Sequence, residues 1–101
     1  MLPSVYLIKR NDIYNNEYKI GKGSPEKRKR ELQTGSAQQL LLISYYESKY
    51  ASKIEKALHN RYSYCKIHGE WFNLQLKDEL EFLANCKKIE NNLIFLEENK
   101  I

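Results

Sequence analysis

Hydrophobic and polar residues alternate with a period of two in two short segments near the start of the chain, residues 4–9 and 17–21. A stretch rich in Asn and Asp, residues 11–16, separates them and is typical of a turn. The pattern predicts two antiparallel strands. Tyr6 and Lys19 then share one face of the sheet if the strand register allows it.

A glycine break and a basic helix follow the second strand. Gly21 and Gly23 permit close backbone approach, and a Ser-Pro pair then favours a helix start over residues 25–33. Arg28 and Leu32 lie one turn apart on this helix. Because Leu32 is expected to face the core, Arg28 should lie near the buried edge, beside a helix start that suits an anion.

The rest of the chain predicts one more strand and several helices. Residues 40–46 form a nearly continuous apolar run, which indicates a central strand. Residues 49–62 have apolar positions at helical spacing, and residues 69–74 form a short aromatic segment that could add a strand. Residues 76–101 are amphipathic and indicate one or two covering helices, with dimerisation as the alternative role.

These elements together predict an α/β (α+β) fold, a small, three-stranded, mainly antiparallel sheet flanked by helices. The chain has 101 residues, which suits a single domain over 1–101. Within it we expect a core over 4–74 and a C-terminal helical extension over 75–101.

The charge is unevenly distributed along the chain. The net charge is +4, but residues 1–74 hold 13 Lys and Arg against 7 Asp and Glu, whereas residues 75–101 hold 4 against 6. The first three quarters therefore suit contact with a polyanion such as a nucleic acid. On charge alone, lysines that merely solvate a small domain are an equally good interpretation.

Cysteine usage and hydropathy bear on the compartment. Cys65 and Cys86 form neither a CxxC pair nor a disulfide framework, so we expect reduced thiols with no metal role. No apolar run approaches the roughly 20 residues of a membrane span, so we expect no membrane partner. The expected location is cytoplasmic, in the host cytoplasm if the chain is encoded by a phage.

Glu55 and His59 lie four residues apart and so share one face of the second helix. By spacing alone, Glu55 is better explained as a solvated partner of nearby lysines, and His59 as a partly buried helix residue. The His-Glu-x-x-His pattern of zinc proteases is absent.

Five short motifs nevertheless occur in an order that resembles a known family. They are Val5-Tyr6, Lys19-Ile20-Gly21, Arg28, Glu55 within Ile-Glu-Lys-Ala-Leu-His, and Gly69-Glu70-Trp71-Phe72. Over residues 4–74 the chain resembles the GIY-YIG nuclease superfamily, in particular a small phage and microbial branch with Lys-Ile-Gly as its second motif. A lysine, Lys19, stands where that family usually has its second tyrosine.

The resemblance implies a divalent-metal-dependent endonuclease that hydrolyses DNA phosphodiester bonds with low sequence specificity. It assigns one Mg²⁺ or Mn²⁺ to Glu55 and the positioning or deprotonation of water to Tyr6. Arg28 would hold the phosphate, Lys19 would stabilise developing charge, and His59 would be an auxiliary acid or base.

Three further basic residues, Lys22, Lys27 and Arg30, are expected to bind nucleic acid, with RNA not excluded. Two alternatives remain open at this stage: a catalytically inactive nucleic-acid-binding module, and a regulatory protein-binding domain. The sequence also leaves open whether Arg28 or Arg30 is the motif arginine, and whether Asn73 or Glu70 joins the site.

Overall fold

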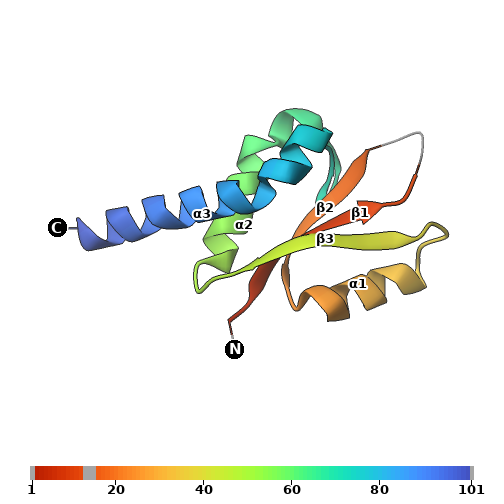
Figure 1. Ribbon diagram of the computed structural model, residues 1–101, viewed down its shortest axis with the longest axis horizontal. Helices are drawn as coiled ribbons and strands as arrows, with labels where there is room; N and C mark the ends of the chain where they lie inside the picture. The colour runs from red at the N-terminus through yellow and green to blue at the C-terminus, as the bar shows by residue number, and fades with distance from the viewer. Residues whose placement is uncertain (1, 13–15, 101) are drawn as a thin grey trace.

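The computed structural model describes residues 2–12 and 16–100, which form one sheet with helices on both faces (Figure 1). The strands are β1 (Ser4–Arg10), β2 (Glu17–Gly23), β3 (Leu40–Glu47), β4 (Lys66–His68) and β5 (Trp71–Asn73). The helices are α1 (Pro25–Thr34), α2 (Ala51–Arg61) and α3 (Leu76–Glu98), and a 3₁₀ turn, η1 (Ser63–Cys65), follows α2. The α+β class predicted from the sequence is confirmed.

The sheet has five strands in the order β3-β1-β2-β5-β4, and each neighbouring pair is antiparallel. The prediction of three strands is therefore wrong. Of the two extra strands, β5 falls within residues 69–74, which the sequence suggested as a possible further strand. The other, β4, was not expected, because three residues are too few for an alternating pattern to be detected. Part of the turn predicted at residues 11–16, namely residues 13–15, lies outside the described residues.

The third strand, β3, lies at one edge of the sheet and not at its centre as predicted. Its apolar run has another cause, because α1 contacts β3 from one side and α3 contacts it from the other. Covered faces, not neighbouring strands, account for the hydrophobic sequence.

The alternation along β1 divides the core into two layers. Val5 and Leu7 belong to the larger core, beneath α2 and α3, whereas Tyr6 and Ile8 belong to a smaller core on the α1 side. In Figure 1, α1 lies on one side of the sheet and α2 and α3 on the other. The register pairs Ile8 with Lys19, so Tyr6 and Lys19 share a face.

The C-terminal extension is a single helix, α3, which continues beyond the sheet (Figure 1). Phe82 and Cys86 are buried, whereas Leu80 and Leu83 are 74% and 46% exposed. Both pairs recur at helical spacing, so the sequence pattern does not tell which pair faces the core. The way in which α3 packs on the sheet decides this. The dimerisation role considered for this segment stays a prediction.

Polar contacts attach α3 to the sheet. Glu90 accepts hydrogen bonds of 2.6 Å from the hydroxyls of Tyr46 and Ser48, and Glu79 accepts one of 2.6 Å from Tyr18. Among the described residues, no helix combines the length and the apolar character needed to cross a membrane.

Candidate active site

The candidate site lies where β2 runs past the end of its neighbour β5. Within the described residues, β5 pairs with β2 only over Glu17–Lys19, and one further bond joins the Ile20 amide to the Glu70 carbonyl. The last part of β2, from Gly21 onward, therefore forms an open edge. Side chains from both helical layers can meet at this edge without crossing the sheet.

Gly21 allows Tyr6 to reach the open edge. The two residues are paired across β1 and β2, and a Cβ atom on residue 21 would lie 2.3 Å from the Tyr6 hydroxyl oxygen. No side chain larger than hydrogen fits there without displacing the ring. The tyrosine is almost fully buried, at 2% exposure, although its hydroxyl end contributes to a cavity.

This cavity has a volume of about 500 Å³ and is bordered by residues of two strands, two helices and the β4–β5 turn. Its lining consists of Tyr6, Lys19, Lys22, Arg28, Glu31, Leu32, Glu55 and Glu70. Three cationic and three carboxylate side chains thus surround one phenol. We call this space the catalytic cavity, after the role that we propose for it below.

Arg28 enters the catalytic cavity from the first turn of α1 and is the most accessible of its ion-paired cations. Its guanidinium lies beside Gly23, where a Cβ atom would be 3.2 Å from Nε. It hydrogen-bonds Glu31 at 3.4 Å, and the two side chains are 54% and 48% exposed. A long ion pair in solvent is weak, so the guanidinium is available to an anionic ligand.

The two lysines are held in different ways. Lys22 Nζ donates a hydrogen bond of 2.9 Å to Ser52 near the start of α2. Lys19 Nζ forms an ion pair of 2.9 Å with Glu70, and its side chain is 15% exposed. It also lies over the Trp71 ring, at 5.9 Å from the ring centre. The ion pair with Glu70 therefore offsets part of the charge of Lys19, whereas the hydrogen-bond partner of Lys22 is uncharged.

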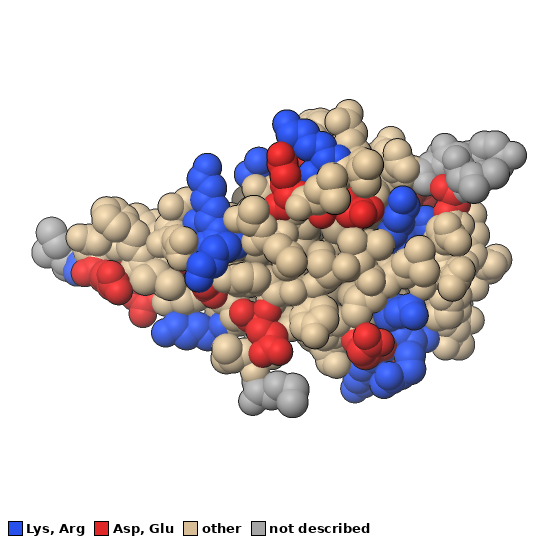
Figure 2. Space-filling view, viewed as in Figure 1, with Lys and Arg blue, Asp and Glu red and all other residues tan. Residues whose placement is uncertain are grey.

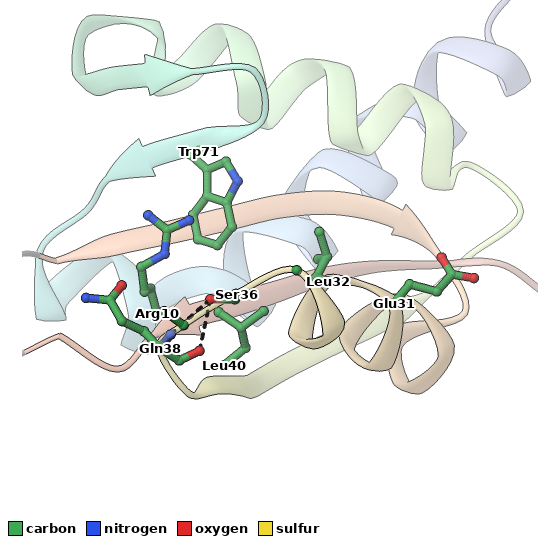
Figure 3. A pocket seen from close by; sticks show the side chains of 9 residues that line it. Arg10, Glu31, Leu32, Ser36, Gln38, Leu40 and Trp71 are labelled. Atoms are coloured by element: carbon green, nitrogen blue, oxygen red, sulfur yellow. Dashed lines mark hydrogen bonds between the residues drawn. The ribbon is translucent and has the colours of Figure 1, made fainter.

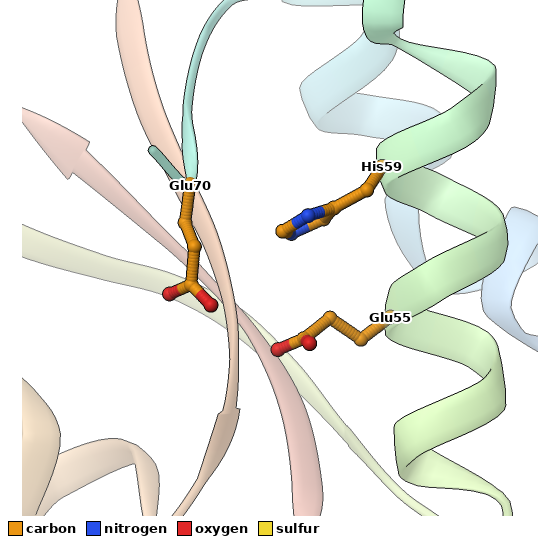
Figure 4. A group of neighbouring side chains, drawn as sticks. All are labelled: Glu55, His59 and Glu70. Carbon is orange, nitrogen blue, oxygen red and sulfur yellow. The ribbon is translucent and has the colours of Figure 1, made fainter. Parts of the chain in front are cut away.

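Glu55 and His59 project from α2 towards Glu70, which lies in the turn between β4 and β5 (Figure 4). One potential ligand atom from each residue lies within 4.8 Å of the others. We call these three residues the carboxylate–histidine cluster. Their type and spacing fit the donor set of a divalent cation.

The surroundings of Glu55 disfavour its ionised form. Partial burial and the facing Glu70 carboxylate raise the pKa of Glu55, and the nearby His59, Lys22 and Lys19 counteract this only in part. Burial also raises the pKa of Tyr6 to about 12, with a further contribution from Glu70. Tyr6 is therefore a neutral phenol at neutral pH and a hydrogen-bond donor, not a ready base.

A backbone contact fixes the orientation of His59. Its Nε2 lies 2.8 Å from the Ile20 carbonyl oxygen, and its ring packs edge-on against Phe72 with the ring centres 5.0 Å apart. Because a carbonyl only accepts, Nε2 carries the hydrogen. In the neutral ring the lone pair is then on Nδ1, a common arrangement for a histidine that binds a metal.

The structure thus brings Tyr6, Lys19, Lys22, Arg28 and Glu55 to one cavity and puts His59 beside Glu55. Other candidates from the sequence lie elsewhere. Lys27, Arg30 and Asn73 are exposed and do not line the cavity. Of the two residues left open, Glu70 joins the site and Asn73 does not.

Sequence reasoning did not assign Glu31 to the site. The available signal was its position three residues after Arg28, which places the two side chains on one face of α1. Glu70 had a weaker signal, since only folding of the β4–β5 hairpin brings it opposite Glu55.

Charged side chains outside the cavity are mixed in sign. In the view of Figure 2, Lys and Arg side chains gather over α1, with acidic side chains close by. This face therefore lacks the uniform basic surface that the charge of residues 1–74 suggests.

The fold and cavity define a small α+β domain with a mixed cationic and carboxylate site at the open edge of an antiparallel sheet. The T5orf172 domain model matches residues 4–90, and the chain belongs to this family. The identification with the GIY-YIG superfamily is wrong, because the family model that matches is a different one. Neither the comparison with curated proteins nor that with solved structures gives a match.

Proposed function

We propose that this domain is a divalent-metal-dependent phosphodiesterase that cleaves DNA with low intrinsic sequence specificity. The observation that carries the proposal is the junction of two groups of side chains at one cavity. Lys19, Lys22 and Arg28 suit a phosphate, and the carboxylate–histidine cluster adjoins them. Cleavage of a phosphodiester needs both a cationic cradle and a strong Lewis acid.

The cluster fits one Mg²⁺ or Mn²⁺. Glu55 and Glu70 offer the carboxylate oxygens that both ions prefer, and the imidazole of His59 suits Mn²⁺ better than Mg²⁺. A cation near the two carboxylates would also relieve the repulsion that raises the pKa of Glu55. When bound, such an ion polarises a phosphate and lowers the pKa of water.

The chain's own side chains then orient and neutralise the substrate. Arg28 binds two phosphate oxygens with its planar guanidinium, exchanging its long contact with Glu31 for the ligand. Lys22 lines the same cavity, beside Ser52 of α2, and balances the charge that grows on the phosphoryl oxygens.

Tyr6 donates a hydrogen bond from its phenol and so positions the attacking water or a phosphate oxygen. Its pKa of about 12 supports this role over proton abstraction at neutral pH. Lys19 acts mainly through Glu70, which it holds towards Glu55 by their ion pair.

We also propose a cytoplasmic location. Both cysteines, Cys65 and Cys86, are free thiols, as in proteins of reducing compartments. Burial raises the pKa of the Cys86 thiol to about 12, which makes that sulfur unreactive.

The test is cleavage of supercoiled plasmid and labelled single-stranded DNA with Mg²⁺, with Mn²⁺ and with EDTA. Glu55→Gln and Arg28→Ala should each lower the rate by about 10²- to 10³-fold. Glu98→Gln and Arg61→Ala are matched controls, because both residues are exposed and lie outside the cavity. At saturating DNA these controls should cut at the wild-type rate.

Two outcomes would overturn the proposal. Cutting that survives in both cavity variants would show that the cavity is not the active site. Salt-sensitive binding of DNA without cutting in either metal would identify a binding module that lacks turnover.

A further inference from the structure

A second cavity, of about 570 Å³, adjoins the catalytic cavity on the α1 side of the sheet. Glu31 and Leu32 line both spaces, so the two cavities are neighbours along α1. Its remaining walls come from the end of β1, the start of β3, the loop after α1 and Trp71 on β5 (Figure 3). We call it the side cavity.

The side cavity has one planar wall, the Arg10 guanidinium stacked on the ring of Trp71, a residue that is 8% exposed. Trp71 lies on one side of the cavity and the loop with Ser36 and Gln38 on the other (Figure 3), and Leu32 and Leu40 complete the apolar part of its lining. The Arg10 guanidinium lies 4.1 Å from the centre of the Trp71 ring, and Glu17 holds Arg10 through an ion pair. Aromatic rings and stacked arginine planes are the surfaces on which proteins bind unpaired nucleobases.

Polar groups border the side cavity. The loop after α1 contributes Ser36 and Gln38, and the Ser36 hydroxyl donates to the Gln38 carbonyl at 2.9 Å. The side-chain amide of Gln38 donates a hydrogen bond of 3.2 Å to the Asp12 carboxylate. A concave site that combines apolar side chains with a few polar groups can hold a small heterocycle.

The side cavity lies next to the proposed phosphate site along α1. Arg28 lines the catalytic cavity, and Leu32, one helical turn or about 5.4 Å further along, lines both. A phosphate at Arg28 would therefore have a neighbouring base beside the opening of the side cavity.

We infer that the side cavity binds an unpaired nucleobase next to the phosphate held by Arg28, so that the domain acts on single-stranded DNA or on nucleotides unpaired within a duplex. A base stacked and paired in a regular duplex cannot enter the side cavity without being extruded. The inference rests on the proposed function for the position of the phosphate.

Trp71 is the only tryptophan in the chain, and its fluorescence reports directly on the side cavity. The experiment is titration in EDTA with a thymidine 12-mer, with a 12-mer of the same backbone that lacks bases, and with a blunt duplex. The intact single strand should quench the fluorescence and bind about tenfold more tightly than the other two, since stacking of one base contributes this much.

Gly35→Phe is designed to fill the side cavity. Gly35 lines it, has an ordinary φ of −98°, and a Cβ atom built there meets no other atom within 4 Å. This variant should bind the intact strand no better than the baseless one, with unchanged affinity for the baseless strand. Gly35→Ala is the matched control and should keep the tenfold preference.

Equal affinity of the wild-type protein for all three ligands would overturn the inference, and this comparison does not depend on how Gly35→Phe folds. A preference that survives in a folded Gly35→Phe protein would overturn it as well. Base-dependent binding without any cleavage in Mg²⁺ or Mn²⁺ would instead support the side cavity while refuting catalysis.

Discussion

At the scale of single residues, the site depends on a glycine that leaves room for a neighbouring ring and on a carboxylate in an unfavourable environment. Gly21 makes room for Tyr6, and Glu55 is a partly buried carboxylate that faces another carboxylate. Each is poorly explained by stability alone, which is typical of positions that serve function.

Gly21→Ala should disrupt the site through Tyr6. The new Cβ atom would lie 2.3 Å from the hydroxyl oxygen of an almost fully buried ring, so the ring must shift. We expect a loss of about 1–3 kcal/mol in the free energy of unfolding and a strong loss of cleavage. Chemical denaturation and the cleavage assay measure the two effects.

Gly35→Ala is the control for this substitution, because a Cβ atom there meets nothing within 4 Å. It should change the free energy of unfolding by no more than about 0.5 kcal/mol. A Gly21→Ala protein with wild-type stability and cleavage would show that the ring is not held as described.

Glu55→Gln should stabilise the protein although it slows cleavage. The folded state raises the pKa of Glu55 above its ordinary value of 4.5, chiefly through burial and then through Glu70. The folded protein therefore binds this proton more tightly than the unfolded chain does, and the ionised carboxylate destabilises the fold at neutral pH.

The expected signature is pH-dependent. In EDTA, the melting temperature of Glu55→Gln should exceed that of the wild type at pH 7. The difference should shrink as the pH falls through the raised pKa of Glu55 and disappear below about pH 4.5. Glu98→Gln is the matched control and should show no such trend. A melting temperature at pH 7 that is lower for Glu55→Gln than for the wild type would show that the ionised Glu55 carboxylate does not destabilise the fold.

At the scale of elements, α3 shows how tertiary contacts choose between two apolar stripes. Phe82 is 1% exposed, whereas its neighbour Leu83 is 46% exposed. Hydrogen bonds from Tyr46 and Ser48 to Glu90 fix the rotation of the helix on β3 and lower the pKa of that carboxyl.

Phe82→Ala should therefore cost about 3–5 kcal/mol of unfolding free energy, because it empties a filled site in the core. Leu83→Ala, one residue away, should cost less than about 1 kcal/mol, because Leu83 is 46% exposed and its side chain buries much less surface than that of Phe82. Urea denaturation of the two variants provides the comparison. Similar losses in both would show that α3 is rotated from the described position.

The elements also show the reach of sequence patterns. Alternation located β1 and β2 and assigned Tyr6 to the face that it occupies, because burial on one face of a strand imposes a period of two. The same reasoning missed β4, whose three residues are all exposed, and misplaced β3 because its two covered faces resemble the burial of a central strand.

At the scale of the whole molecule, some of the basic residues expected to bind DNA lie apart from the cavity proposed for cleavage. Lys27 and Arg30 are exposed on α1 and lie outside the catalytic cavity. If they bind DNA, they do so through the backbone phosphates and without base readout.

Lys27→Ala and Arg30→Ala should each weaken DNA binding and reduce the slope of log affinity against log salt by about 0.7 for single strands. The cleavage rate at saturating DNA should not change. Fluorescence anisotropy across a salt series measures the slope. Lys88→Ala, an exposed position on α3, should leave the slope unchanged. Equal effects of all three substitutions would indicate diffuse attraction without a binding face.

The sequence by itself determined the α+β class, the two strands of the first hairpin and the extent of α1. Periodicity, glycine placement and helix starts are local properties, and residues close in sequence carry them. Only the tertiary structure decided that Glu70 faces Glu55, that α3 turns Phe82 inward, and that Trp71 and the loop after α1 enclose a second cavity. These pairs lie many residues apart, and their contact depends on strand order and on the path of each turn, which no local pattern encodes.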